Sequence, residues 1–243
     1  MLKKLLSEHF KKGQRIRALV TAVVFLSLLF SIVYAAIQAA RSPSGAIASP
    51  GQRLKSDYVL MLLQCILGLA LMFLPSLISR GWKIIIPSYM QIAFYVFLYA
   101  GIYLGEVRNF YYDIPHWDTL LHTTSGAMLG TLGFSIVDML NRQDEIKLRM
   151  SPVFVALFAF CFAVTSGVLW EIYEFTVDSV ARLNMQKYAA STGELLAGRA
   201  ALMDTMKDLT VDTLGALIIS VVGYISYSRQ RTIARIDRIG DAF

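Results

Sequence analysis

The stretch Asp204-Thr-Met-Lys-Asp208-Leu-Thr-Val-Asp212-Thr-Leu-Gly215 combines three evenly spaced aspartates with the start of a long apolar segment. The aspartates recur every four residues, which places them along one face of a helix at steps of about 6 Å. Residues 214–227 are almost wholly apolar and predict a membrane-spanning helix. An acidic side chain inside a bilayer costs roughly 2.5–3.5 kcal/mol. The sequence therefore predicts that a cation, protons, a basic partner or a water-filled cavity offsets these charges.

The composition places the whole chain in the membrane class. Of its 243 residues, 56% are hydrophobic and only 16% are charged, and the mean hydropathy is +0.55. These values exclude an ordinary soluble domain. The net charge of +6 comes from basic residues that flank apolar segments, so no nucleic-acid partner is expected. Cys65 and Cys161 lie within apolar runs and predict packing residues rather than a disulfide.

Apolar segments of membrane-spanning length predict an all-α fold, a polytopic transmembrane helical bundle with about six spans. We expect a basic segment at 1–17, a single membrane domain at 18–228 and a basic tail at 229–243. A longer connection with helical character is expected at 178–203. The spans themselves are expected at about 18–40, 58–79, 87–104, 118–140, 152–175 and 206–227.

The distribution of basic residues predicts the orientation in the membrane. Six spans put both termini on the same side. The termini and the second and fourth connections hold fifteen Lys and Arg residues, against seven in the other connections. By the positive-inside rule, both termini are predicted to be cytoplasmic. The expected location is a bacterial plasma (inner) membrane with membrane lipid as a partner, and the sequence leaves the oligomeric state open.

This topology gathers the unusual ionisable residues at the outer ends of spans three to six. Asp118 and His122 stand four residues apart, and Glu171, Glu174 and Asp178 share another helical face. Two such carboxylates ~6 Å apart repel by roughly 3 kcal/mol. A divalent cation is the expected cofactor: oxygen ligands suit Mg²⁺, Ca²⁺ or Mn²⁺, and one imidazole also admits Zn²⁺ or Fe²⁺. Protons shared between carboxylates are the alternative.

The first functional hypothesis is a metal-dependent enzyme that acts on a lipid, a lipid-linked compound or another small molecule of the cell envelope. One alternative is a proton- or cation-coupled transporter or lipid flippase, because acids within membranes often mark ion pathways. Another is a non-catalytic scaffold with a structural cation site. The first hypothesis assigns His122, Asp118 and Glu174 to catalysis, Arg199, Ser125 and Glu106 to substrate binding, and Glu171, Asp208, Asp212 and Asp204 to the metal.

Several motifs carry a resemblance to known families. Leu-Gly-Glu106, Trp117-Asp118-x3-His122-x2-Ser125-Gly126, Trp170-Glu171-x2-Glu174-Phe175 and Asp204-Thr-Met-x-Asp208 resemble the YjdF-like family of bacterial integral membrane proteins, a domain of unknown function. Asp118, His122, Glu171, Arg199, Asp208 and Gly215 are more distantly similar to VanZ-like membrane proteins. This chain has Glu174 where those proteins have Gln and Asp212 where they have Asn, which makes its site more acidic. The second resemblance implies a cell-envelope setting.

Overall fold

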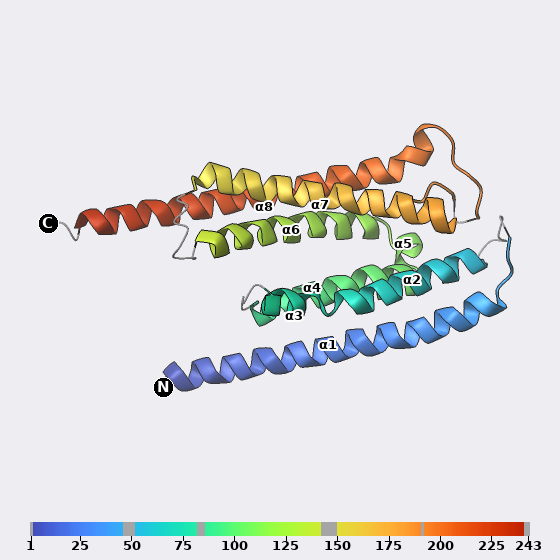
Figure 1. Cartoon of the computed structure of the whole chain (residues 1–243), viewed down its shortest axis with the longest axis horizontal. Helices are drawn as coiled ribbons and strands as arrows, with labels where there is room; N and C mark the ends of the chain where they lie inside the picture. Colours follow the sequence, from blue (N-terminus) through green and yellow to red (C-terminus); the bar gives the residue numbers. More distant parts are fainter. Residues whose placement is uncertain (1, 46–51, 82–85, 142–149, 191, 241–243) are drawn as a thin grey trace. The chain divides into compact units, whose positions relative to one another are not determined.

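The computed structural model describes residues 2–45, 52–81, 86–141, 150–190 and 192–240 (Figure 1). Its elements are helices, which confirms the expected all-α class. Within these described ranges, six helical segments are long and apolar enough to cross a membrane, and they confirm the polytopic prediction. These segments are Gly13–Arg41, Lys55–Gly81, Ser88–Val107, Trp117–Asn141, Pro152–Ala181 and Arg199–Ile233.

The chain folds into two compact units. Unit 1 contains Met1–Asp118 and Ala181–Leu196, and unit 2 contains Thr119–Val180 and Ala197–Phe243. The chain therefore passes from unit 1 to unit 2 within a single helix that begins at Trp117. The single membrane domain expected over residues 18–228 stays a prediction.

The helices of unit 1 come from the amino-terminal half of the chain. Its elements are α1 (Leu2–Arg41), α2 (Lys55–Leu71), α3 (Leu74–Gly81), α4 (Ser88–Leu98), the π-helix η1 (Tyr99–Val107) and α5 (Phe110–Asp113). The core joins Val24, Leu28 and Ala35 of α1, which recur on one helical face, to Met61 and Cys65 of α2. The basic segment expected at the amino terminus is helical from Leu2 and runs into the first span without a break.

The third span ends in a wide helical turn that no pattern in the sequence predicts. Helix α4 continues directly into η1, and the backbone N–H of Arg108 donates to the carbonyl of Tyr103, five residues earlier, at 2.9 Å. Gly105 allows the Tyr111 ring to approach this turn, because a Cβ at Gly105 would lie 2.7 Å from the ring Cζ. This turn carries Glu106.

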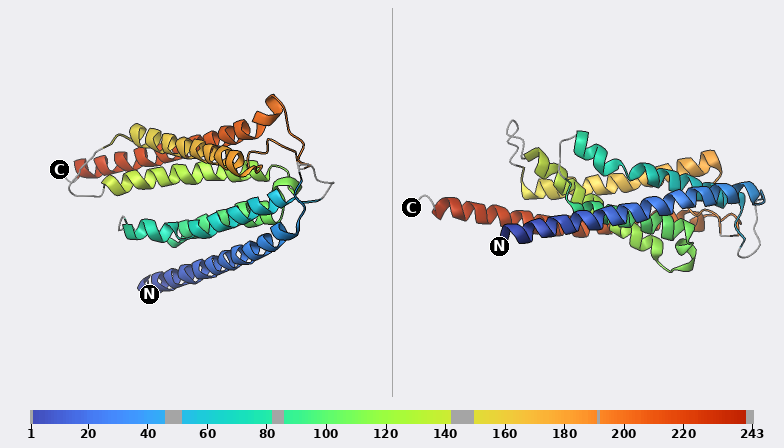
Figure 2. Two further views of the ribbon diagram at one scale, coloured as in Figure 1. Left: turned by 45° about the vertical axis from the view of Figure 1, so that its right-hand side comes forward. Right: turned by 90° about the horizontal axis from the view of Figure 1, so that it is seen from below.

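The described part of unit 2 is a bundle of three helices. They are α6 (Trp117–Asn141), α7 (Pro152–Ala181) and α8 (Arg199–Gly240), and they lie side by side in the views of Figures 1 and 2. Glycines bring the backbones close: Gly133 of α6 meets the backbone of Ala159 on α7, and a Cβ on Gly126 would collide with the Asp212 carbonyl of α8. Close approach through small residues is the usual means of packing helices in membranes.

The buried face of α7 changes from apolar to acidic along its length. Small and apolar residues are buried every third or fourth position up to Gly167, and the same spacing then buries three acids. The acids are thus buried because they continue the packing seam of the helix. The complete seam is Val155, Ala159, Ala163, Gly167, Glu171, Glu174 and Asp178.

The connection between α7 and α8 is shorter than expected and is not helical in its described part. Residues 178–181 belong to α7 and residues 199–203 to α8. Between them, Ala189 and Leu195 form an isolated antiparallel bridge, and Arg182, Lys187 and Gly193 adopt positive φ. The helical character expected there is wrong, since positive φ interrupts a right-handed helix.

Candidate metal centre

Two of the three aspartates on α8 are buried. Asp208 is 2% exposed and Asp212 is 4% exposed, whereas Asp204, nearer the start of the helix, is half-buried. Their spacing of four residues places them on the packed face of α8. An ionised carboxylate at such burial requires compensating partners.

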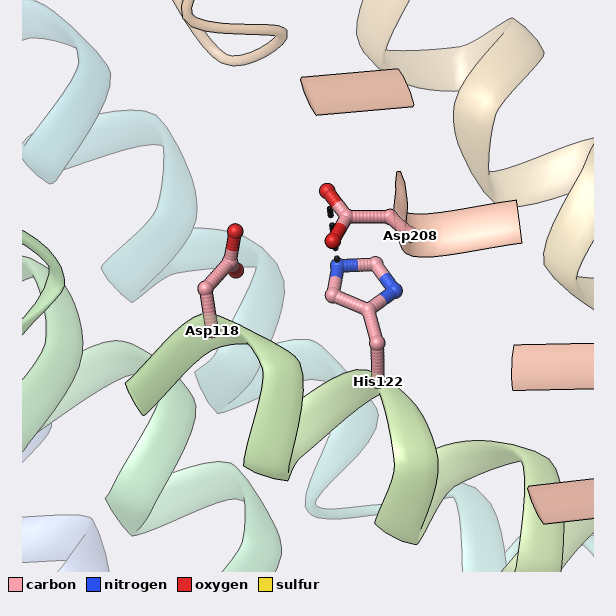
Figure 3. A group of neighbouring side chains, drawn as sticks. All are labelled: Asp118, His122 and Asp208. Atoms are coloured by element: carbon pink, nitrogen blue, oxygen red, sulfur yellow. Dashed lines mark ion pairs between the residues drawn. The ribbon is translucent and has the colours of Figure 1, made fainter. Parts of the chain in front are cut away.

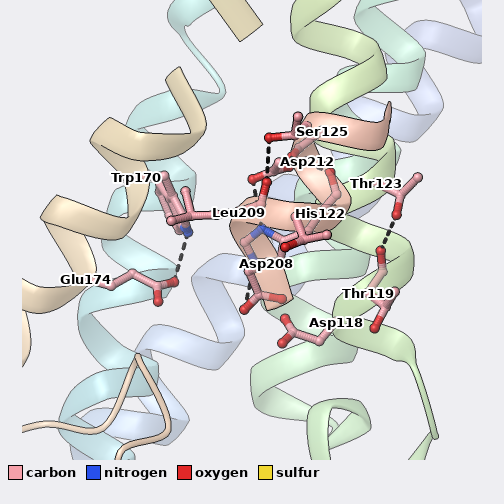
Figure 4. A network of polar contacts seen from close by, with 12 residues as sticks. Asp118, Thr119, His122, Thr123, Ser125, Trp170, Glu174, Asp208, Leu209 and Asp212 are labelled. Carbon is pink, nitrogen blue, oxygen red and sulfur yellow. Dashed lines mark hydrogen bonds and ion pairs between the residues drawn. The ribbon is translucent and has the colours of Figure 1, made fainter. Parts of the chain in front are cut away.

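Side chains of α6 contact both carboxylate oxygens of Asp212. The hydroxyl of Ser125 donates a hydrogen bond to Oδ1 at 2.6 Å, and Nδ1 of His122 lies 3.2 Å from Oδ2 (Figure 4). A glycine on α7 leaves room for this carboxylate, because a Cβ on Gly167 would lie 2.9 Å from Oδ2. Asp212 is therefore placed to orient His122, and the direct metal ligation that the sequence predicted for Asp212 stays a prediction.

His122 faces a second aspartate with its other ring nitrogen. Nε2 lies 3.8 Å from Oδ2 of Asp208, which is longer than a hydrogen bond. An ionised Asp212 favours the histidine tautomer that carries its proton on Nδ1. The lone pair then resides on Nε2, on the side of Asp208. A carboxylate that holds the far nitrogen in this way is typical of metal-binding histidines.

Asp118 adds a second carboxylate from the helix that carries His122. It is largely buried and lies one turn before His122 on α6 (Figure 3). Asp118, His122 and Asp208 each offer one ligand atom, and these atoms lie within 4.8 Å of one another. Two carboxylates and one imidazole suit Mn²⁺, Fe²⁺ or Zn²⁺. We call these three residues the candidate metal centre.

Lys187, which belongs to none of the sequence motifs, pairs with a residue of this centre. Its Nζ lies 2.5 Å from Oδ2 of Asp118 and 5.2 Å from the centre of the Tyr111 ring. The side chain of Asn184 exchanges two hydrogen bonds with the backbone of Ala189, at 2.8 and 2.9 Å, and so closes the short loop around Lys187. The loop thereby presents an ammonium group to a candidate metal ligand.

Helix α7 supplies the remaining buried acids of unit 2. Oε1 of Glu174 accepts a hydrogen bond from the indole N–H of Trp170 at 2.8 Å (Figure 4). Glu171 is 4% exposed, and within the described chain neither of its oxygens accepts a hydrogen bond of good geometry, although Thr205 lies beside it. Its ionisable neighbours include His122 and Asp212. Glu171 thus depends on a proton or a cation for compensation more than Glu174 does.

The other predicted substrate-binding residues have different surroundings. Arg199 is exposed in the first turn of α8, nine residues before Asp208, which corresponds to about 13 Å along a helix. Glu106 belongs to η1 in unit 1, where its backbone carbonyl accepts a hydrogen bond from Arg53 at 3.2 Å. The structure thus brings His122 and Ser125 together with Asp208 and Asp212, and the chemical role of each residue stays a prediction.

Comparison with known proteins identifies a family. The family described as "Predicted membrane protein (DUF2238)" matches residues 16–229, which is most of the chain. A protein of Thermotoga maritima, named only "Uncharacterized protein", is 33% identical over 130 residues, which is 53% of this chain and 57% of the Thermotoga protein. The chain thus spans little more than half the length of that relative, and no solved structure matches it. The chain belongs to the DUF2238 family of membrane proteins.

Proposed function

We propose that this protein is a divalent-metal-dependent membrane enzyme that acts on the head group of a lipid or of a lipid-linked cell-envelope compound. The observation that supports this most is the group Asp118, His122 and Asp208, with Asp212 behind His122. Three protein ligands leave coordination positions for water and substrate, as catalytic metal sites do and closed structural sites do not. All three ligands lie within the first three turns of their helices, a depth that suits a head group.

The proposed reaction is hydrolysis of an ester or phosphoester bond. A bound divalent ion would supply polarisation of the substrate oxygen and an activated water. Asp212 would keep the Nδ1 proton of His122 on the side away from the ligand atoms, and Glu171 would accept the proton of the attacking water. The hydroxyl of the water joins the acyl or phosphoryl group, and the proton passes to the leaving alcohol. This assignment gives the role of base to Glu171, which the sequence predicted as a metal ligand. Glu174 is less suited to that role, because the Trp170 N–H already occupies one of its oxygens.

The setting in the cell is part of the proposal. The YjdF-like and VanZ-like resemblances favour a bacterial inner membrane, and only the VanZ-like one favours a cell-envelope substrate. With both termini cytoplasmic, as the positive-inside rule predicts, the start of α6 and the start of α8 would face the outer side. Substrates of the outer leaflet are therefore the first to test.

A matched pair of histidine variants tests the proposal. The purified protein, loaded with Mn²⁺ or Zn²⁺, is incubated with phospholipid vesicles and lipid-linked envelope precursors, and released head groups are measured by mass spectrometry. His122→Asn should abolish turnover in a folded protein. His116→Asn should retain it, because His116 is exposed and asparagine tolerates its φ of 62°. Metal-loaded wild type without turnover on any of these substrates would contradict the enzyme assignment.

A second candidate function is proton- or cation-coupled transport. It is favoured by the row of buried acids on α7, Glu171, Glu174 and Asp178, which share one helical face. Reconstituted vesicles would then show a pH-dependent flux that Glu171→Gln removes. The third candidate, a scaffold with a structural cation site, predicts a bound ion that neither exchanges nor supports turnover or flux.

A further inference from the structure

Unit 1 contains an open cavity that the proposed function does not use. Its volume is about 230 Å³, smaller than the ≈ 300–1,000 Å³ of sites for drug-sized ligands. The walls come from α1, α3 and α4. The residues that line it are Arg17, Pro75, Ser76, Ser79, Arg80 and Gln91.

The lining has the chemistry of an anion site. Arg17 and Arg80 contribute two permanent positive charges, and Ser76 and Ser79, three residues apart on α3, contribute hydroxyl donors. Among the described lining residues no acid balances the two arginines. Guanidinium groups and hydroxyls together are well suited to phosphate oxygens.

One of the two arginines is positioned by a hydrogen-bonded chain. The amide nitrogen of Gln91 donates to the backbone carbonyl of Ile86 at 2.9 Å, which fixes the orientation of the amide. The amide oxygen then accepts a hydrogen bond from Nη1 of Arg17 at 3.3 Å. This contact uses one of the five N–H donors of the guanidinium. Arg17 is thus held in the cavity wall, and this contact does not use most of the N–H donors of its guanidinium group.

The cavity lies where three spans reach the membrane surface. Arg17 is near the start of the span Gly13–Arg41, Arg80 is at the end of Lys55–Gly81, and Gln91 is in the first turn of Ser88–Val107. This is the depth of lipid head groups. Leu77, on the same helix as the serines, is 63% exposed and can contact an acyl chain.

We propose that this cavity binds the phosphate group of an anionic membrane lipid. Basic pockets between membrane helices recognise such head groups, chiefly on the cytoplasmic side, where the positive-inside rule places this end of the spans. The exposed apolar side chain beside the cavity favours a lipid over free phosphate as the source of the anion. The site is distinct from the candidate metal centre, because none of the residues that line the cavity belongs to that centre.

Binding of defined ligands to the delipidated full-length protein tests this proposal. The ligands are short-chain phosphatidylglycerol, short-chain phosphatidylcholine and inorganic phosphate, and binding is followed by native mass spectrometry and by the melting temperature. Phosphatidylglycerol should bind and raise the melting temperature, and the other two should not. Equal binding of phosphatidylcholine would overturn recognition of the anionic charge, and equal binding of inorganic phosphate would overturn the lipid as the source.

Variants then locate the site. Arg17→Gln and Arg80→Gln should each weaken phosphatidylglycerol binding about tenfold, the effect of losing one charge-assisted contact. Arg41→Gln should bind like wild type, because this exposed arginine ends the same helix α1 on the opposite side. If an arginine variant fails to fold, the double variant Ser76→Ala/Ser79→Ala tests the same cavity. Wild-type affinity in folded cavity variants would overturn the assignment.

Discussion

Nδ1 of His122 lies 3.2 Å from Oδ2 of Asp212, and this contact decides which nitrogen of the histidine can bind an ion. Because Asp212 also accepts a hydrogen bond from Ser125, its carboxylate is fixed in place and can hold the Nδ1 proton. Nε2 is then available on the side of Asp208. The candidate metal centre therefore depends on a residue that we do not expect to touch the metal.

Asp212→Asn tests this positioning role. The asparagine amide can offer an N–H group to Nδ1 of His122, which moves the histidine proton to Nε2 and removes the lone pair from the ligand side. We expect metal affinity to fall about 10–100-fold, the usual effect of changing a residue behind a ligand. Isothermal titration of the folded protein with Mn²⁺ or Zn²⁺ measures it. Asp113→Asn, an exposed change in α5, is the control, and equal affinities for both variants would refute the positioning role.

Asp208→Asn should separate metal binding from stability. The change removes one buried negative charge from an acidic cluster, so the metal-free protein should melt at the same temperature as wild type or higher. Wild type should gain about 2.7 kcal/mol of stability when the metal is present at 100 times its Kd, and Asp208→Asn should gain almost none. Thermal melting with and without metal measures both effects. A metal-induced shift that survives the substitution would exclude Asp208 as a ligand.

Lys187→Met probes the ammonium group beside Asp118. Without its partner, the buried carboxylate of Asp118 loses compensation, so the metal-free protein should be destabilised by about 1–3 kcal/mol. A divalent ion should in contrast bind about tenfold more tightly, because a competing positive charge is gone. Lys55→Met, an exposed change at the start of α2, should alter neither quantity. Weaker metal binding by Lys187→Met would show that the lysine supports the centre rather than competing with the ion.

Gly126→Ala tests the close packing that brings α6 and α8 together at the site. The added methyl group would collide with the backbone carbonyl of Asp212, and the helices would have to separate. We expect a loss of about 1–3 kcal/mol in the free energy of unfolding, together with weaker metal binding. Gly81→Ala, where no atom of the described residues lies within 4 Å of the new Cβ, is the matched control and should be neutral or slightly stabilising. Equal unfolding free energies would mean that the helices tolerate a wider separation.

The spans could be predicted from the sequence because a bilayer requires long apolar helices whatever the tertiary structure. The approach of Asp118 and His122 on α6 to Asp208 on α8 could also be predicted, since the order of antiparallel spans fixes which helix ends meet. The partners of those acids were harder to predict from the sequence. Asp212 and His122 are 90 residues apart in the chain, and their pairing follows from the contact of Gly126 with the Asp212 backbone.

Lys187 is the clearest example of a residue whose contact could not be predicted from sequence patterns. In the sequence it is one of three basic residues in the connection after the fifth span, with Arg182 and Arg199. Only the loop closed by Asn184 and Ala189 distinguishes it, because that loop turns its side chain toward Asp118. The π-helical turn at Tyr99–Val107 was equally hidden, since no residue pattern in this span distinguishes i→i+5 from i→i+4 hydrogen bonding.

The most direct test of the central claim is the metal content of the purified full-length protein, measured by elemental mass spectrometry beside His122→Asn and Asp208→Asn. The candidate metal centre predicts roughly one divalent ion per wild-type chain after controlled loading, and little in the two folded variants. Wild type without bound metal after loading, or variants that retain as much metal as wild type, would contradict a centre formed by Asp118, His122 and Asp208.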